Sequence, residues 1–436
     1  MWTDTWVFGE EELRRNGIGD TDTPTLLDLR LFRKYSESGS SYSFIHACMQ
    51  EFCAAMFYLL DSPQDHPSRA VRPIEALLLT YFRKDRASWV FLGCFLFGLL
   101  HESEQQRLDA LLGMQRSREL APQLLGCLRS LVEMEDPEEQ VEFLLLFYAL
   151  FEVQSDAFAS HLMSSLREAH FPLRERPDLA VAAYCLKYCC SLRELTVSVP
   201  EIFPEERGPD PIRTLLWWRQ ICSVLTTNEH LRKLRVVDTI FGKWTLLILC
   251  CQLRESTCPV QRLETRKVSF SCETGIFFEV FTSNPNLQHL SMTSTQLSHD
   301  EVWFLCSVLS NPVCNLQELL MDGCQLNKYS CPHLSEVLLS NANLRHLDLS
   351  RNPLMDEGVA QLCEALRQPG RSSHPLCCSL ESCQLTRACC EDLASVIAHS
   401  QTLHELDVTS NALSPGGVML LCEAVRGPKC VLRKLR

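Results

Sequence analysis

Four residues in the C-terminal half have the types that could bind a metal ion. His374, Cys377, Cys378 and Cys383 lie close together in the sequence, and imidazole and thiolate are common zinc ligands. Structural zinc sites are usually built from paired C-x-x-C knuckles, which are missing here, and Cys383 also has a place in a repeat described below. We therefore expect packing cysteines at this cluster and no metal ion.

The other reactive residues give little support for catalysis. Nucleophilic catalysis needs a nucleophile, a base and an orienting group in one pocket, and the sequence offers no recognisable set. A nucleotide-binding P-loop needs G-x-x-x-x-G-K-[S/T], whose glycines let backbone N–H groups wrap the phosphates. The Gly242-Lys243 pair is followed by Trp244 and has Val237 where the first glycine belongs. We predict no enzyme activity and no cofactor bound by this chain.

The charge balance favours a protein as the binding partner. The formal net charge is -13, with 41 basic against 54 acidic residues, and no strong basic stripe stands out. Nucleic acid or an anionic membrane would need such a stripe. We therefore expect protein partners, and neither nucleic acid nor membrane.

The 24 cysteines are best interpreted as reduced thiols, because a large chain with leucine-rich segments can bury a core without disulfides.

The first residues have no basic region followed by a long apolar run, so we expect no signal peptide and a cytoplasmic location. The most apolar window, 89–100, has 12 residues. A bilayer needs roughly 20, so this window predicts a buried helix.

A repeat is the strongest pattern in the chain. The spacing L-x-x-L-x-L recurs at intervals of 29, 27, 29, 28, 31, 28 and 29 residues. The units start at Leu231, Val260, Leu287, Leu316, Leu344, Pro375, Leu403 and Leu432. An earlier unit starts at Leu192 and is followed by an insert at 200–211, rich in Pro and Glu, which is typical of a surface loop.

Each unit predicts one strand and one helix. In the strand at 344–349 the last two leucines fall on one face, and in the helix at 358–366 the apolar residues recur at helical spacing. A single strand and helix cannot close a core, so the units must stack. The sequence therefore predicts an α/β leucine-rich-repeat horseshoe with parallel strands inside and helices outside.

Two unit types alternate along this array. Eight residues after the start, Asn352 and Asn411 alternate with Cys324 and Cys383. The alternation resembles the ribonuclease-inhibitor type of leucine-rich repeat, and it assigns these cysteines to the scaffold. In the unit at Pro375, Pro and Cys replace leucines, so we expect weak local stacking there. The last unit is only begun, and we expect that the natural array continues.

The N-terminal half is different. Residues 61–188 have mostly helical periodicity, interrupted by polar breaks, which predicts an all-α domain leading into the repeats. Before them, 42–60 is apolar at helical spacing, which predicts a continuous amphipathic helix with His46 in its first turn.

Two motifs resemble a known family. Phe44-Ile45-His46 followed by Gln50-Glu51-Phe52-Cys53-Ala54-Ala55 is similar to the winged-helix signature at the end of the NACHT ATPase module in NOD-like receptors. The Leu-Cys-Glu-Ala-Leu/Val segments at 362–366 and 421–425 resemble the NLRP branch, which carries NACHT, leucine-rich repeats and usually a pyrin domain. The resemblance runs the whole length of the chain.

This resemblance implies a domain order and a nucleotide contact. Residues 1–60 would be the winged-helix tail of a NACHT module, 61–188 the NACHT-associated helical domain and 189–436 the leucine-rich repeats. Intact family members bind ATP or ADP, and His46 would contact the ADP phosphate if a NACHT P-loop were supplied. Walker A, Walker B and pyrin sequences are missing here, so the residues themselves favour a structural histidine at a helix start.

The predicted function is that of a cytosolic NLRP-like regulatory or scaffold protein, in innate immune and inflammatory regulation or in the germline and early embryo. Its partners would be proteins, or a NACHT module bound intramolecularly. Two alternatives stay open: an inhibitor of the ribonuclease-inhibitor kind, and an ATP-dependent switch if an upstream P-loop is missing. We predict that the partner-binding residues are the variable positions of the inner strands, namely Gln288, Ser291, Gln317, Leu320, Arg345, Asp348, His404 and Asp407.

Overall fold

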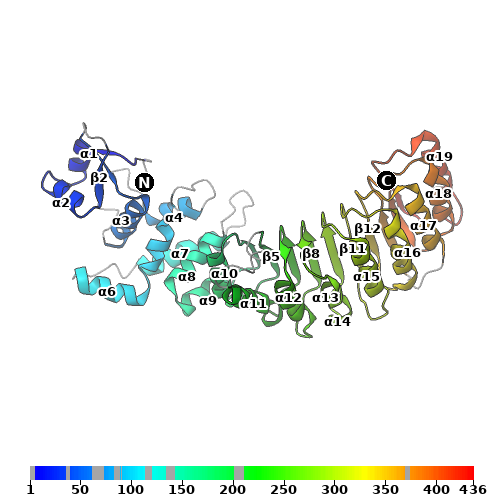
Figure 1. Ribbon diagram of the computed structural model, residues 1–436, viewed down its shortest axis with the longest axis horizontal. Coiled ribbons are helices and arrows are strands. Elements are labelled where there is room, and N and C mark those ends of the chain that lie inside the picture. The colour runs from blue at the N-terminus through cyan, green and yellow to red at the C-terminus, as the bar shows by residue number, and fades with distance from the viewer. Residues whose placement is uncertain are drawn as a thin grey trace. The chain divides into compact units, whose positions relative to one another are not determined.

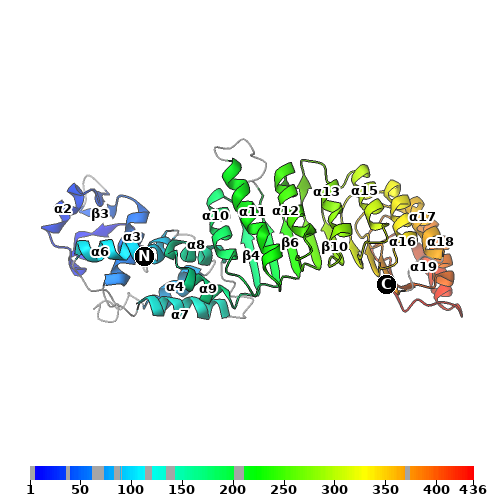
Figure 2. The same ribbon diagram turned by 90° about the horizontal axis from the view of Figure 1, so that it is seen from below.

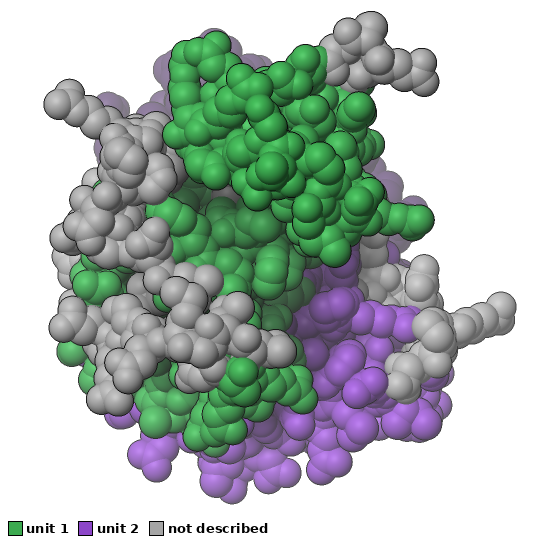
Figure 3. Space-filling view, turned by 90° about the vertical axis from the view of Figure 1, so that its left-hand side faces the viewer, with its two compact units in different colours: residues 1–166 green, residues 167–436 purple. Residues whose placement is uncertain are grey.

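The computed structural model describes residues 5–35, 40–60, 73–82, 89, 91–112, 120–133, 143–200, 211–368 and 374–436. The insert predicted as a loop at 200–211 lies mostly outside these residues. The chain forms two compact units, residues 1–166 and 167–436 (Figure 3). We describe each unit by itself.

Unit 1 begins with a small antiparallel sheet of the order β1-β3-β2. Its strands are β1 (Phe8–Gly9), β2 (Phe32–Lys34) and β3 (Ser41–Phe44), and α1 (Glu10–Arg15) and α2 (Asp22–Asp28) lie between the first two. Leu13, Phe32 and Tyr42 form the buried core. The helix predicted from residue 42 is therefore wrong at its start, because the backbone of β3 pairs with both neighbouring strands and α3 (Ala47–Leu60) begins only after them.

The other described elements of unit 1 up to residue 163 are helices. They are α3, α4 (Ile74–Phe82), α5 (Leu92–Gly98), α6 (Glu102–Leu112), α7 (Leu120–Glu133), α8 (Phe143–Val153) and α9 (Asp156–Met163). Within the apolar window at 89–100, residues 92–98 form the largely buried helix α5, which packs against α3 and α8. Buried Glu51 on α3 accepts a hydrogen bond from the backbone N–H of Phe91 at 2.7 Å and so holds the start of α5. No helix among the described residues is long and apolar enough to cross a membrane.

Unit 2 is a parallel-sheet solenoid of ten strands (Figure 1). In spatial order along the sheet these are β4 (Glu168–Pro172), β5 (Glu194–Ser198), β6 (Lys233–Val237), β8 (Arg262–Arg266), β10 (His289–Thr293), β11 (Glu318–Leu320), β12 (His346–Asp348), β13 (Leu376–Ser379), β14 (Leu403–Asp407) and β15 (Lys434–Leu435). The parallel pairing agrees with the predicted horseshoe. Because β4 pairs with β5, the sheet begins before residue 189, where the repeats were expected to start.

Helices stand side by side along one face of this sheet (Figure 2). They are α10 (Arg176–Leu186), α11 (Pro211–Thr227), α12 (Lys243–Arg254), α13 (Gly275–Phe278), α14 (Val280–Ser283), α15 (His299–Leu309), α16 (Cys331–Ser340), α17 (Met355–Arg367), α18 (Cys390–His399) and α19 (Ser414–Val425), with short 3-10 turns at Lys328–Ser330 and Arg387–Cys389. A minor two-stranded sheet joins β7 (Ile240–Phe241) and β9 (Ser269–Phe270). Among the described residues of unit 2, no helix lies on the other face of the main sheet, which we call the open face.

The unit at Pro375 stacks better than its sequence suggests. Strand β13 pairs with both β12 and β14, and Cys378 takes the buried leucine position with 4% of its surface exposed. The irregularity is confined to a register shift between Leu376 and Cys377. A buried thiol is a small apolar side chain, so it can replace leucine without a polar penalty.

Candidate binding surface on the open face of the sheet

Strand register fixes two rows of side chains on the open face. The buried row of Leu290, Leu319, Leu347, Cys378 and Leu406 points towards the helices. Because side chains alternate along a strand, the residues on either side of this row point the other way. One open-face row is His289, Glu318, His346, Cys377, Glu405 and Lys434, and the other is Ser291, Leu320, Asp348, Ser379 and Asp407.

The structure places the eight predicted residues in two groups. Ser291, Leu320, Asp348 and Asp407 share the second row, although Ser291 is only 8% exposed. Gln288, Gln317, Arg345 and His404 each precede the first row by one residue, where their backbone carbonyls accept hydrogen bonds from the next repeat. Their contribution to the sheet is thus made through the main chain, and their role in binding remains a prediction.

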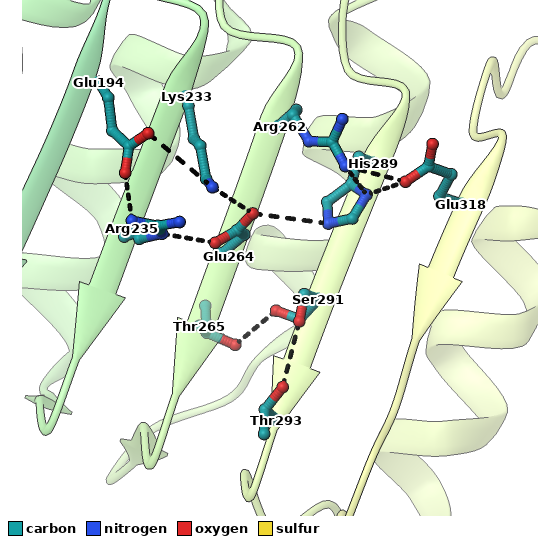
Figure 4. Close-up of polar contacts among 10 residues, drawn as sticks. All are labelled: Glu194, Lys233, Arg235, Arg262, Glu264, Thr265, His289, Ser291, Thr293 and Glu318. Atoms are coloured by element: carbon teal, nitrogen blue, oxygen red, sulfur yellow. Dashed lines mark hydrogen bonds and ion pairs between the residues drawn. The ribbon is translucent and has the colours of Figure 1, made fainter. Parts of the chain in front are cut away.

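The N-terminal half of the open face holds a continuous ion-pair network (Figure 4). On β5, β6 and β8, Glu264 accepts hydrogen bonds from Arg235 at 2.7 Å and forms an ion pair with Lys233 at 2.9 Å. Glu194 pairs with the same two cations. The carboxylates are about one-fifth exposed, so these pairs are partly shielded from solvent.

The network continues onto β10 and β11. Arg262 pairs with Glu318 at 3.0 Å, and His289 lies between Glu318 and Glu264. The whole set contains three carboxylates and three permanent cations, and every carboxylate contacts at least one cation. This network therefore neutralises its own charge.

The surroundings shift the acidities of these groups. Burial pushes the pKa of Glu264 up, but hydrogen bonds from Arg235 and Lys233 outweigh it and hold that pKa below its usual value. The pKa of Glu318 is lowered as well, because the contacts with His289 and Arg262 outweigh burial. Burial lowers the pKa of His289, with a further contribution from Arg262, against the opposing effect of the two carboxylates.

The C-terminal half of the open face is hollowed. A depression of about 430 Å³ lies over β12 to β15. Its lining includes five carboxylates and three permanent cations, namely Asp322, Asp348, Glu381, Glu405 and Asp407 with Arg351, Lys434 and Arg436. This depression, which we call the C-terminal hollow, is more acidic than basic.

In the C-terminal hollow, the three cations form ion pairs with only three of the five carboxylates. Arg351 forms a two-point pair with Asp322, Arg436 lies 3.5 Å from Asp407, and Lys434 lies 3.8 Å from Glu405. Asp348 accepts hydrogen bonds from the backbone and hydroxyl of Ser350. Within the described part of the chain, neither Asp348 nor Glu381 forms an ion pair.

Sequence reasoning missed the charged residues of the earlier repeats. Arg235 and Glu264 occupy the same strand position as Ser291, which was considered, whereas Glu194 and Lys233 lie in the neighbouring row of His289 and Glu318. Extending the L-x-x-L-x-L alignment to every unit would have found them. Their mutual pairing needs the register between strands, which a single repeat does not contain.

His46 lies just before α3 and is exposed. Its Nδ1 accepts a hydrogen bond from the backbone N–H of Cys48 at 3.2 Å and lies 2.9 Å from the Cys48 sulfur. The imidazole thus caps a free N–H of the first helical turn. This contact fits a structural histidine at a helix start, and the nucleotide contact remains a prediction.

The cysteine-rich segment near residue 378 shows scaffold contacts. Cys383 donates a hydrogen bond from its thiol to the carbonyl oxygen of Leu349 at 3.2 Å, and burial raises its pKa to about 12. No group of three or more metal-binding side chains gathers anywhere in the described residues.

Comparisons with known proteins agree with this architecture. Residues 1–44 match the family described as the NOD2 winged helix domain, and 46–161 match the NLRC4 helical domain HD2. Residues 340–363 and 399–422 match the leucine-rich repeat. These matches divide the chain at other points than 60 and 188, the divisions expected from the sequence. The chain has the winged-helix end, helical domain and repeats of a NOD-like receptor.

Similar full-length proteins show which branch of the NOD-like receptors this chain belongs to. The chain is 41% identical over its full length to the mouse NACHT, LRR and PYD domains-containing protein 4C and covers 44% of that protein. It is 41% identical to the mouse protein 4B, of which it covers 50%, and 34% identical to human protein 14, of which it covers 40%. The chain belongs to the NLRP family, and it spans about half the length of the relatives it matches.

A solved structure, described as the crystal structure of the Rad7 and Elc1 complex in yeast, is a more distant likeness. It aligns with a TM-score of 0.36 and 15% identity over 83% of this chain and 92% of that chain. The family assignment rests on the sequence relatives.

Proposed function

We propose that this chain acts as a cytoplasmic regulatory or scaffold protein that binds protein partners through the open face of its repeats. Its setting would be inflammatory signalling, or the germline and early embryo. The proposal assigns the chain no catalytic step. The observation that carries it is the open face itself, where parallel strands present adjacent rows of mostly polar side chains and no helix of the described part of unit 2 covers them.

Leucine-rich repeats suit this role because the scaffold and the surface use different residues. The buried leucine row and the alternating Asn and Cys side chains after each strand hold the units together. The strand residues that point to the open face are therefore free to vary. Such a face can bury the area that a specific protein interface needs, roughly 800 Å² per partner. In the C-terminal hollow the charged side chains are only partly paired, so a partner can supply the missing contacts.

A pair of matched variants tests this function. Leu320→Arg places a bulky charge on the open face, and Glu336→Arg places the same charge on the exposed side of α16. The tagged full chain would be expressed in cells and its co-purifying proteins identified by quantitative mass spectrometry. We expect a set of proteins to be lost from Leu320→Arg and retained by Glu336→Arg. Identical sets for both variants would overturn open-face binding, provided that circular dichroism shows both variants folded.

A further inference from the structure

The two halves of the open face differ in how their charges are satisfied. In the N-terminal half every carboxylate of the network contacts a cation of the same chain (Figure 4). In the C-terminal hollow, Arg351 is occupied by Asp322, while Asp348 and Glu381 have no ion pair within the described residues. A cationic side chain of a partner would have to compete with existing ion pairs in the network, whereas at Asp348 and Glu381 it would compete only with the more distant attraction of Arg351 and, at Asp348, with the hydrogen bonds from Ser350.

Asp348 and Glu381 are placed to act on one ligand group. Asp348 ends β12 and is paired in register with Ser379 on β13. Glu381 follows Ser379 by two residues, in the turn after β13, and both acids line the hollow. Strand β12 is also flanked by Leu320, which is only partly buried and offers an apolar surface beside Asp348.

This surface has the chemistry that a long cationic side chain needs. The stem of Lys or Arg packs on apolar surface while its charged end seeks a carboxylate. Arg can form bidentate hydrogen bonds to a carboxylate, and charge-assisted bonds of this kind are the stronger ones in proteins. The acid groups repel phosphate, so nucleic acid and anionic lipid do not fit this half.

We propose that the C-terminal hollow binds a basic segment of a protein partner, with a Lys or Arg side chain held between Asp348 and Glu381. This inference rests on the proposed function, because it names the chemistry of the partner that the open face takes. The Arg351–Asp322, Arg436–Asp407 and Lys434–Glu405 pairs form the charged rim of the hollow and orient the segment over β12 and β13.

The test uses a fluorescein-labelled octa-arginine peptide as the probe and the full chain as the receptor. Binding is followed by fluorescence anisotropy at two salt concentrations. The double variant Asp348→Asn/Glu381→Gln removes the two unpaired charges and keeps the side-chain shapes. The control Glu336→Gln/Glu364→Gln removes the same charge from exposed positions on α16 and α17.

We expect saturable binding of the arginine peptide to the unmodified chain. The hollow variant should bind roughly tenfold more weakly, the ratio that corresponds to about 1.4 kcal/mol, and the control variant should differ by less than about twofold. Affinity should fall as salt rises, since the groups are partly exposed. An octa-glutamate peptide should not bind.

Two outcomes would overturn the inference. Equal weakening by both double variants would show that the peptide senses only net charge, and the absence of saturable binding would remove the site. Neither result touches the co-purification test, which uses Leu320→Arg and natural partners. If Leu320→Arg loses its partners while the peptide result is negative, open-face binding stands and only the basic-segment inference fails.

Discussion

The side-chain amide of Asn352 donates a hydrogen bond to the carbonyl oxygen of Met321, 2.7 Å away in the preceding repeat. The same amide nitrogen reaches the carbonyl of Leu349 at 2.9 Å, and its oxygen accepts from the backbone N–H of Leu326 at 3.0 Å. Cys324, at the equivalent place in the other unit type, reaches the carbonyl of Met292 through its thiol. The alternating Asn and Cys side chains therefore donate to carbonyls at equivalent positions of successive repeats.

Asn352→Ala should destabilise the repeats strongly. The side chain is fully buried, so its loss removes the hydrogen bonds to the carbonyl of Met321 and to the N–H of Leu326 at a site that water does not reach. We expect a loss of about 3 kcal/mol in the free energy of unfolding. Asn411→Ala removes equivalent bonds at a partly exposed site, where water can replace them, and should cost about 1 kcal/mol. Urea unfolding followed by circular dichroism measures both, and equal losses would contradict the argument from burial.

Gly417→Ala should destabilise the contact between α18 and α19. A methyl group at this position would lie 2.5 Å from the buried sulfur of Cys390, closer than packing allows. We expect a cost of roughly 1 to 3 kcal/mol from overpacking. The neighbouring Gly416 has only the flexible end of Arg387 at 3.6 Å, so Gly416→Ala should be neutral or gain up to about 1 kcal/mol of helix propensity. Thermal unfolding distinguishes the two, and a stabilised Gly417→Ala variant would refute the close contact.

Cys363 and Cys422 occupy equivalent positions in α17 and α19 but should differ in reactivity. Cys363 is fully buried, and burial raises its pKa to about 12, whereas Cys422 is exposed. Alkylation requires an accessible thiolate. Brief iodoacetamide treatment of the native chain at pH 8 should label Cys422 at least tenfold faster than Cys363, with roughly equal labelling in 8 M urea. Similar native rates, read by peptide mass spectrometry, would show that the repeat opens.

The repeat spacing was sufficient to predict the parallel sheet, because the leucine row is a local pattern that recurs in nearly every unit. Strand β4 escaped prediction because Ala169 and Phe171 stand where the repeat pattern has leucines, and pairing with β5 shows its place in the sheet. Likewise β3 was mistaken for the start of a helix, since the apolar spacing around Tyr42 fits both structures and only pairing with β1 and β2 decides between them. The ion-pair network could not be predicted for the same reason, because Arg235 contacts Glu194 and Glu264 only across strands.

The buried imidazole of His289 should make stability depend on pH. Its side chain is 5% exposed, Nδ1 lies 2.5 Å from Glu318, and Nε2 lies 3.8 Å from Glu264. Protonation would relieve the facing carboxylates but would bury a charge beside Arg262, and burial is the largest of these effects. The pKa of His289 in the folded chain is therefore below its ordinary value of 6.5.

The sign of the effect follows from proton binding. As the pH falls through 6.5 the unfolded chain takes up a proton at this residue before the folded chain does, so the stability that neutral His289 contributes is lost towards lower pH. Each unit by which the pKa is lowered corresponds to about 1.4 kcal/mol. His289→Gln keeps a hydrogen-bond donor for Glu318 but cannot titrate, so its unfolding free energy should fall less than that of the unmodified chain between pH 7.5 and 5.5. A larger fall in the variant would mean that the carboxylates prevail over burial and that His289 is charged in the folded network.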